Sequence, residues 1–145
     1  MKKLLTLMAV LMATASVSLA ATGWGDDYDK ALAQAKTEKK LVLLDFTGSD
    51  WCSWCMKLDK EVFSKPDFKA FAKENLVLVT VDFPNKKLSR KLEKQNADLK
   101  AKYGPNGFPT LVLADPDGKE VHRIGGYKPD ALDDLKKAVE ASKPK

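Results

Sequence analysis

Two cysteines separated by two residues are the part of this sequence with the clearest capacity for chemistry. Cys52 and Cys55 are the only cysteines in the chain. At the start of a helix, unpaired amides and the positive end of the helix dipole stabilise a thiolate on the first cysteine, and the thiolate is the nucleophile in disulfide exchange. We therefore expect Cys52 to attack a substrate disulfide, and Cys55, placed deeper and nearly one turn later, to resolve the mixed disulfide.

The sequence gives less support to a structural disulfide or a metal site at this cysteine pair. A structural disulfide that closes so short a loop constrains the unfolded chain little. A closed zinc site needs four ligands, and the chain adds a single histidine, His122, on a distant predicted strand where we expect it to be exposed. We expect no bound metal or cofactor. The alternatives that stay open are a binding module that holds clients without turnover and, less favoured, a metal carrier.

The cysteine pair follows a strand and a loop. Residues 41–46 form an almost continuous apolar run of strand length, interrupted by Asp45, as is typical of a strand covered on both faces. Residues 47–50 make a loop, and residues 52–63 have helical spacing of apolar side chains. The pair is therefore expected at the start of a helix, as the redox interpretation requires.

The rest of the chain alternates helices and strands. Helices are predicted over residues 26–39, from residue 64 to the next strand, over 88–102 and over 129–141; strands are predicted over 76–83, 110–114 and 119–124. Turn residues at positions 115–118 join the last two strands as a hairpin. This order indicates an α/β domain with a mixed central sheet.

The first 20 residues have the three parts of a secretory signal peptide. Lys2 and Lys3 precede an apolar stretch, and small residues lead to an expected cleavage after Ala20. The alternative is a retained membrane anchor, but the apolar core falls short of the roughly 20 residues that span a bilayer. Residues 21–145 would then form one domain of ordinary size, and the short signal favours the periplasm of a bacterium.

Composition narrows the class of protein further. Hydrophobic residues make up 44% of the chain, enough for a packed core and too many for a disordered chain. The formal net charge is +5, and two of the lysines lie in the leader, so the remaining charge is too small to indicate a nucleic-acid partner. We expect a monomer.

Three spaced motifs resemble the signatures of the thioredoxin superfamily: the DF pair at residues 45–46, WCSWC at residues 51–55 and GFPT at residues 107–110. Residues 51–68 are most similar to exported bacterial thioredoxin-like proteins and to the C-terminal periplasmic domain of the transmembrane reductase DsbD. The resemblance implies a thioredoxin fold, three-layer α/β/α with a central mixed β-sheet. It also implies a thiol-disulfide oxidoreductase that reduces or isomerises protein disulfides.

The resemblance gives Asp45 a candidate catalytic role. A carboxyl group buried behind the dithiol can exchange a proton with Cys55, and burial should raise its pKa toward the working range. The alternative is that Asp45 only caps or hydrogen-bonds a neighbouring backbone. Two departures from the family pattern lie nearby: one additional residue separates Asp45 from Cys52, and Leu78 stands where relatives usually place a lysine.

Four residues are candidates for substrate binding. The resemblance implies that the peptide bond between Phe108 and Pro109 is cis and lies beside Cys52, where its backbone would pair with an extended substrate. Trp51 should pack beside the dithiol and exclude water. Trp54, between the cysteines, should shield the disulfide or offer an apolar contact to unfolded substrates.

The expected partners are cysteine-containing exported proteins and a membrane thiol reductase. A periplasmic dithiol is not recharged by the cytosolic glutathione pool, so a separate electron donor is needed. The resemblance favours reduction or isomerisation, whereas an oxidising compartment could drive the same dithiol as an oxidase. The sequence leaves this direction open.

Overall fold

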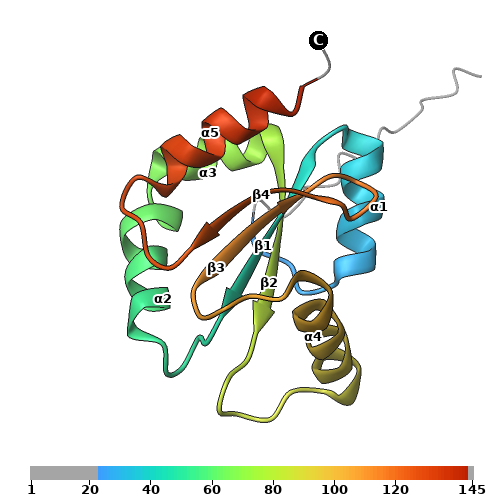
Figure 1. Cartoon of the computed structure of the whole chain (residues 1–145), viewed down its shortest axis with the longest axis vertical. Helices are drawn as coiled ribbons and strands as arrows, with labels where there is room; N and C mark the ends of the chain where they lie inside the picture. The colour runs from blue at the N-terminus through green and yellow to red at the C-terminus, as the bar shows by residue number, and fades with distance from the viewer. Residues whose placement is uncertain (1–22, 144–145) are drawn as a thin grey trace, which may run out of the picture.

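A mixed four-stranded sheet lies at the centre of the part of the chain that the computed structural model describes, residues 23–143 (Figure 1). Its order is β2 (Leu76–Asp82), β1 (Leu41–Thr47), β3 (Thr110–Ala114) and β4 (Glu120–Gly125). β1 and β2 are parallel, and the other two pairings are antiparallel. The mixed sheet and the final hairpin confirm the predicted fold class.

Helices cover both faces of this sheet, so the molecule has three layers. In Figure 1, α2, α3 and α5 lie on one side of the sheet, and α1 and α4 lie on the other. The helical elements are α1 (Tyr28–Glu38), α2 (Ser53–Leu58), the π-helical turn η1 (Asp59–Phe63), α3 (Pro66–Asn75), α4 (Arg90–Tyr103) and α5 (Ala131–Ala141).

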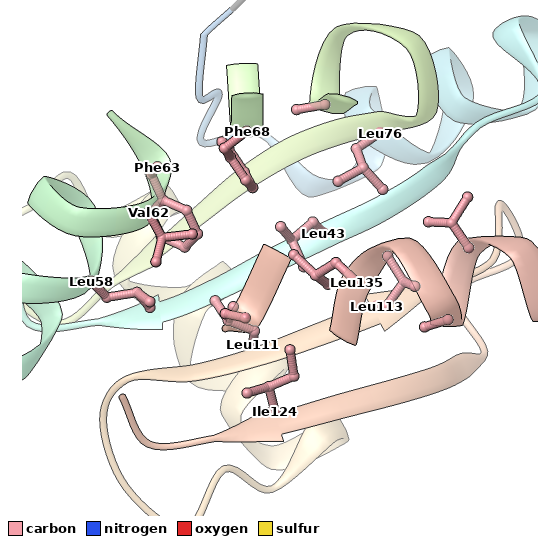
Figure 2. Close-up of a cluster of buried hydrophobic side chains, with 14 residues drawn as sticks. Leu43, Leu58, Val62, Phe63, Phe68, Leu76, Leu111, Leu113, Ile124 and Leu135 are labelled. Atoms are coloured by element: carbon pink, nitrogen blue, oxygen red, sulfur yellow. The ribbon is translucent and has the colours of Figure 1, made fainter. Parts of the chain in front are cut away.

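The two-sided burial of β1 explains its continuous apolar run. Val42, Leu44 and Phe46 face the core under α1 and α4, and Leu43 faces the core under α2, α3 and α5. Figure 2 shows Leu43 between the sheet and Leu135 of α5. Side chains two residues apart on a strand share a face, so residue 45 points toward the same layer as Leu43.

Capping side chains place two helix starts later than predicted. Asp27 accepts a hydrogen bond from the backbone N–H of Lys30 at 3.0 Å, so α1 begins at Tyr28. Ser89 caps α4 in the same way, so this helix begins at Arg90, two residues later than predicted. The predicted helix over residues 52–63 is also divided, because its last turn, η1, is π-helical.

Two polar side chains are more buried than their sequence context indicated. Asn96 lies in the core-facing side of α4 and donates from Nδ2 to the carbonyl of Asp82 at 2.9 Å. His122 was expected to be exposed, and this was wrong. It lies half-buried in β4 opposite Leu113, on the face of the sheet that the helix α5 covers.

The predicted signal peptide, residues 1–20, lies outside the described residues. None of the helices described here combines the length and apolar character required to cross a membrane.

Candidate active site

Cys52 and Cys55 are joined in a disulfide at the start of α2, with their Cα atoms 5.2 Å apart. We expected Cys55 to lie deeper, but the two residues are buried almost equally, with exposed fractions of 6% for Cys52 and 5% for Cys55. Burial therefore does not distinguish the attacking cysteine from the resolving one.

The backbone around the pair does distinguish the two sulfurs. Cys52 is the N-cap of α2, and its Sγ accepts a hydrogen bond from the backbone N–H of Cys55 at 3.2 Å. A hydrogen bond to the charged form lowers the pKa of an acid, so the same amide would favour a thiolate at Cys52 in the reduced protein. The backbone N–H of Cys52 donates to the carbonyl of Gly48 at 2.8 Å, which fixes the loop that presents this sulfur.

Asp45 is a buried carboxyl group in the middle strand β1. Its Oδ1 accepts no hydrogen bond from the described residues, which speaks against a capping role. Burial, together with the smaller effect of the negative charges of Asp59 and Asp82, raises its pKa to about 7. Leu78, on the same face of the neighbouring strand, supplies no positive charge to oppose this. Asp45 can therefore gain or lose a proton near neutral pH.

The loop before the cysteines is tied to the end of β2. The backbone N–H and hydroxyl of Ser49 both donate to the carboxylate of Asp82, and the carboxylate of Asp50 accepts from the backbone N–H groups of Asn85 and Lys86. These bonds hold the loop over residues 48–51 against the end of β2 and the segment that follows it. The position of the dithiol therefore depends on this loop and on that segment.

Trp51 connects the cysteine loop to the segment that contains Pro109. Its Nε1–H donates to the carbonyl of Phe83 at 2.7 Å, and its ring meets Phe108 edge-on at 5.7 Å between centroids. Phe108 also packs on Phe83, and the Nζ of Lys100 lies 5.5 Å and 5.8 Å from the centroids of these two rings. The Phe108–Pro109 peptide bond is cis, as the resemblance implies.

Trp54 belongs to a second aromatic group. Its side chain is 55% exposed and stacks on Tyr127, with centroids 5.5 Å apart and planes 30° apart. The Nζ of Lys57 lies 5.2 Å from the Trp54 ring centroid and 4.8 Å from that of Tyr127. The hydroxyl of Tyr127 donates to the carboxylate of Glu61, which raises the pKa of the tyrosine. Trp54 is thus held by the loop between β4 and α5.

Several residues beside the dithiol were not predicted from the sequence. Tyr127, Lys57 and Lys100 belong to none of the motifs that the sequence analysis singled out. Within the described residues, no group of three or more His, Cys, Asp or Glu side chains is placed to hold a metal ion. The two tryptophans next to the cysteines in the chain, Trp51 and Trp54, thus pack in two separate aromatic groups.

Comparison with known proteins agrees with this geometry. Residues 28–142 match the family model described as a thioredoxin-like domain. The chain is 40% identical to "Disulfide bond reductase DsbH" of Chlamydia pneumoniae over 116 residues, which cover 79% of this chain and 69% of that protein. A solved structure titled "DsbH Oxidoreductase" superposes with a TM-score of 0.75 at 36% identity, covering 90% of this chain and 92% of that one.

A more distant relative is much longer than this chain. "Thiol:disulfide interchange protein DsbD 2" of Pseudomonas aeruginosa is 34% identical over 94 residues, which are 65% of this chain and 15% of that protein. The Cys52–Cys55 pair and these relatives identify the chain as a protein thiol-disulfide oxidoreductase that exchanges disulfides with partner proteins. The chain belongs to the thioredoxin-like domain family.

Proposed function

We propose that this protein is an exported reductase that keeps selected cysteines of periplasmic proteins reduced. The observation that carries the proposal is the Cys52–Cys55 disulfide at the start of α2, because the same pair in its reduced form can deliver two electrons to a substrate disulfide. The printed name of the 40% identical relative, a disulfide bond reductase, supports the reducing direction.

In the first step, the thiolate of Cys52 attacks one sulfur of a substrate disulfide. The substrate S–S bond breaks, a mixed disulfide forms between Cys52 and the substrate, and the released substrate sulfur takes up a proton. The backbone N–H of Cys55 favours this step by stabilising the attacking thiolate.

In the second step, Cys55 loses its proton and attacks the sulfur of Cys52. The mixed disulfide breaks, the substrate leaves as a second thiolate that is then protonated, and the Cys52–Cys55 disulfide is formed. We assign Asp45 as the group that accepts the Cys55 proton, because burial brings its pKa to about 7 and its Oδ1 is not held by a hydrogen bond.

We assign substrate contact to the surface around the dithiol. Trp51 and Trp54 are 46% and 55% exposed, so both rings can cover apolar side chains of a partner. The backbone at Phe108 and Pro109 would pair with the extended substrate segment. The exposed rings also suit the alternative of a client-binding module without turnover, and the experiment below separates the two.

The oxidised protein must be reduced again in each cycle. We propose a membrane thiol reductase as the electron donor, in line with the similarity to a thiol:disulfide interchange protein. In this scheme, cleavage after Ala20 releases residues 21–145 into the periplasm as a monomer without a bound cofactor.

Stoichiometric reduction of a disulfide-bonded test protein, such as insulin, tests the proposal. The reduced chain should release insulin thiols and recover the Cys52–Cys55 disulfide, and Cys55→Ser should instead accumulate a mixed disulfide through Cys52 that mass spectrometry detects. Failure of the wild-type chain to reduce the test protein would refute the reductase. Retention of biological function in the Cys52→Ser/Cys55→Ser double variant would favour the binding module.

A further inference from the structure

Two lysine-capped aromatic groups adjoin the dithiol. The first, called here the Lys57 group, consists of Trp54, Lys57 and Tyr127. The second, the Lys100 group, consists of Phe83, Lys100 and Phe108. In each group an ammonium nitrogen lies within 6 Å of two ring centroids, the range in which a cation is attracted to the face of an aromatic ring.

The two groups come from opposite layers of the fold. Lys57 lies on α2 and Lys100 on α4, and these helices lie on opposite sides of the sheet (Figure 1). Trp51, next to Cys52, contacts the Lys100 group through Phe108. Trp54 lies between the two cysteines and is itself part of the Lys57 group. The segment that carries the two cysteines therefore contacts the Lys100 group through Trp51 and forms part of the Lys57 group through Trp54.

A backbone bond also connects the two groups beside the proposed substrate segment. The N–H of Gly126 donates to the carbonyl of Pro109 at 2.8 Å. Gly126 has a φ of +76°, a left-handed conformation that glycine adopts without strain, and it directly precedes Tyr127. The loop that carries Tyr127 is thus fixed to the chain directly after Phe108, so the two groups frame one surface.

The lysines of this surface have no partner of opposite charge. In the part of the chain that the structure describes, neither Lys57 nor Lys100 forms a salt bridge. Glu61, four residues after Lys57, accepts the hydroxyl of Tyr127, and Asp50 accepts two backbone N–H groups. The ammonium groups are therefore free to bind a carboxylate that a partner brings.

We propose that the protein prefers disulfides whose cysteine lies in an acidic segment, with apolar side chains against the rings and carboxylates against Lys57 and Lys100. This inference rests on the proposed function and names its substrate class. Exposed ion pairs contribute little each, so about a threefold change in rate per lysine is expected, and about tenfold for the two together. Salt screens such pairs, so the preference should shrink at high ionic strength.

Three disulfide-linked peptide dimers test the preference. They share one apolar sequence around a cysteine and differ only in the residues two positions to each side, which are Glu, Gln or Lys. The second-order rate constant for reaction with the reduced protein is measured by stopped flow. Each value is divided by the rate constant of the same peptide with dithiothreitol, because flanking charges change the intrinsic reactivity of the disulfide.

The matched control is a variant with the same net charge as the test variant. Lys57→Gln/Lys100→Gln and Lys69→Gln/Lys136→Gln each remove two exposed lysines, and the second pair lies on α3 and α5, outside both groups. We expect the Glu peptide to react about tenfold faster than the Gln peptide, and the Lys peptide to react slowest. The Lys57→Gln/Lys100→Gln variant should lose this order, and the control variant should keep it.

Three results would overturn the proposal while leaving disulfide reduction intact. The first is equal normalised rates for the three peptides, and the second is an acidic preference that the Lys57→Gln/Lys100→Gln variant retains. The third is a preference lost equally in both lysine variants, which would assign the effect to net charge. Absence of reaction with all three peptides would instead refute the proposed reductase itself.

Discussion

Replacing Asp45 with Asn should stabilise the oxidised protein at alkaline pH and leave it almost unchanged at pH 4. Asp45 is buried, and its pKa is raised from an ordinary value of 3.8 to about 7, first by burial and then by the charges of Asp59 and Asp82. Between these two values the folded protein binds a proton that the unfolded chain has lost. Stability therefore falls as the pH rises through this range.

The size of the effect follows from the two pKa values. Each tenfold change in the ionisation constant corresponds to about 1.4 kcal/mol, so a pKa raised from 3.8 to about 7 lowers the free energy of unfolding by about 4 kcal/mol once the carboxyl group is ionised. Asn cannot ionise and avoids this loss. Asp45→Asn should thus gain about 4 kcal/mol at pH 8 and little at pH 4.

Urea denaturation of the oxidised protein from pH 4 to pH 9 measures this difference. Asp67→Asn, which removes an exposed carboxylate from α3, is the matched control and should show no comparable rise. In the reduced protein, Asp45→Asn should also slow the release of substrate from the mixed disulfide by about a hundredfold at pH 7, the effect of losing a general base. A stability difference that does not change between pH 4 and pH 8 would refute the assignment of a buried carboxyl group with a raised pKa.

Three further substitutions test the packing around the site. Gly48→Ala should displace the indole of Trp51, because the added Cβ would overlap that ring, and should lower stability by about 1–3 kcal/mol with a shift in tryptophan fluorescence. Tyr103→Phe removes the hydroxyl that bonds to the Tyr28 hydroxyl at 2.7 Å and to the β3–β4 turn, and should lower stability by about 1–3 kcal/mol in thermal unfolding. Leu43→Ala leaves a cavity at a fully buried position in the core and should lower stability by about 2–5 kcal/mol in urea denaturation. A loss below about 1 kcal/mol would contradict the packing shown in Figure 2.

The fold could be predicted from local patterns because its strongest signals are local. The apolar run of β1 reads as a strand buried on both faces, and β1 does lie between two helical layers. The turn residues at 115–118 indicated the hairpin of β3 and β4. The π-helical turn η1 was not predicted, because the spacing of Leu58, Val62 and Phe63 fits an α-helix equally well, and their burial depends on α3 and the sheet.

The residue pattern alone predicted the candidate site where one segment carries it, and the distant Phe108 and Pro109 were expected only through the resemblance. The spacing of Cys52 and Cys55 and the carboxyl group of Asp45 inside an apolar strand are visible in the sequence. Tyr127 and Lys100 are not, because they lie far along the chain, in the β4–α5 loop and in α4, and meet Trp54 and Phe83 only in the folded protein. Such contacts depend on how the layers pack rather than on any local pattern.

The reduction potential of the Cys52–Cys55 pair tests the central claim most directly. The mature protein is equilibrated with dithiothreitol or glutathione buffers, and the fraction of disulfide is measured at each ratio. A reductase should have a potential near the thioredoxin value of about −270 mV. A potential near about −120 mV, which is typical of a strong disulfide oxidant, would contradict the account and assign the same cysteine pair to oxidation.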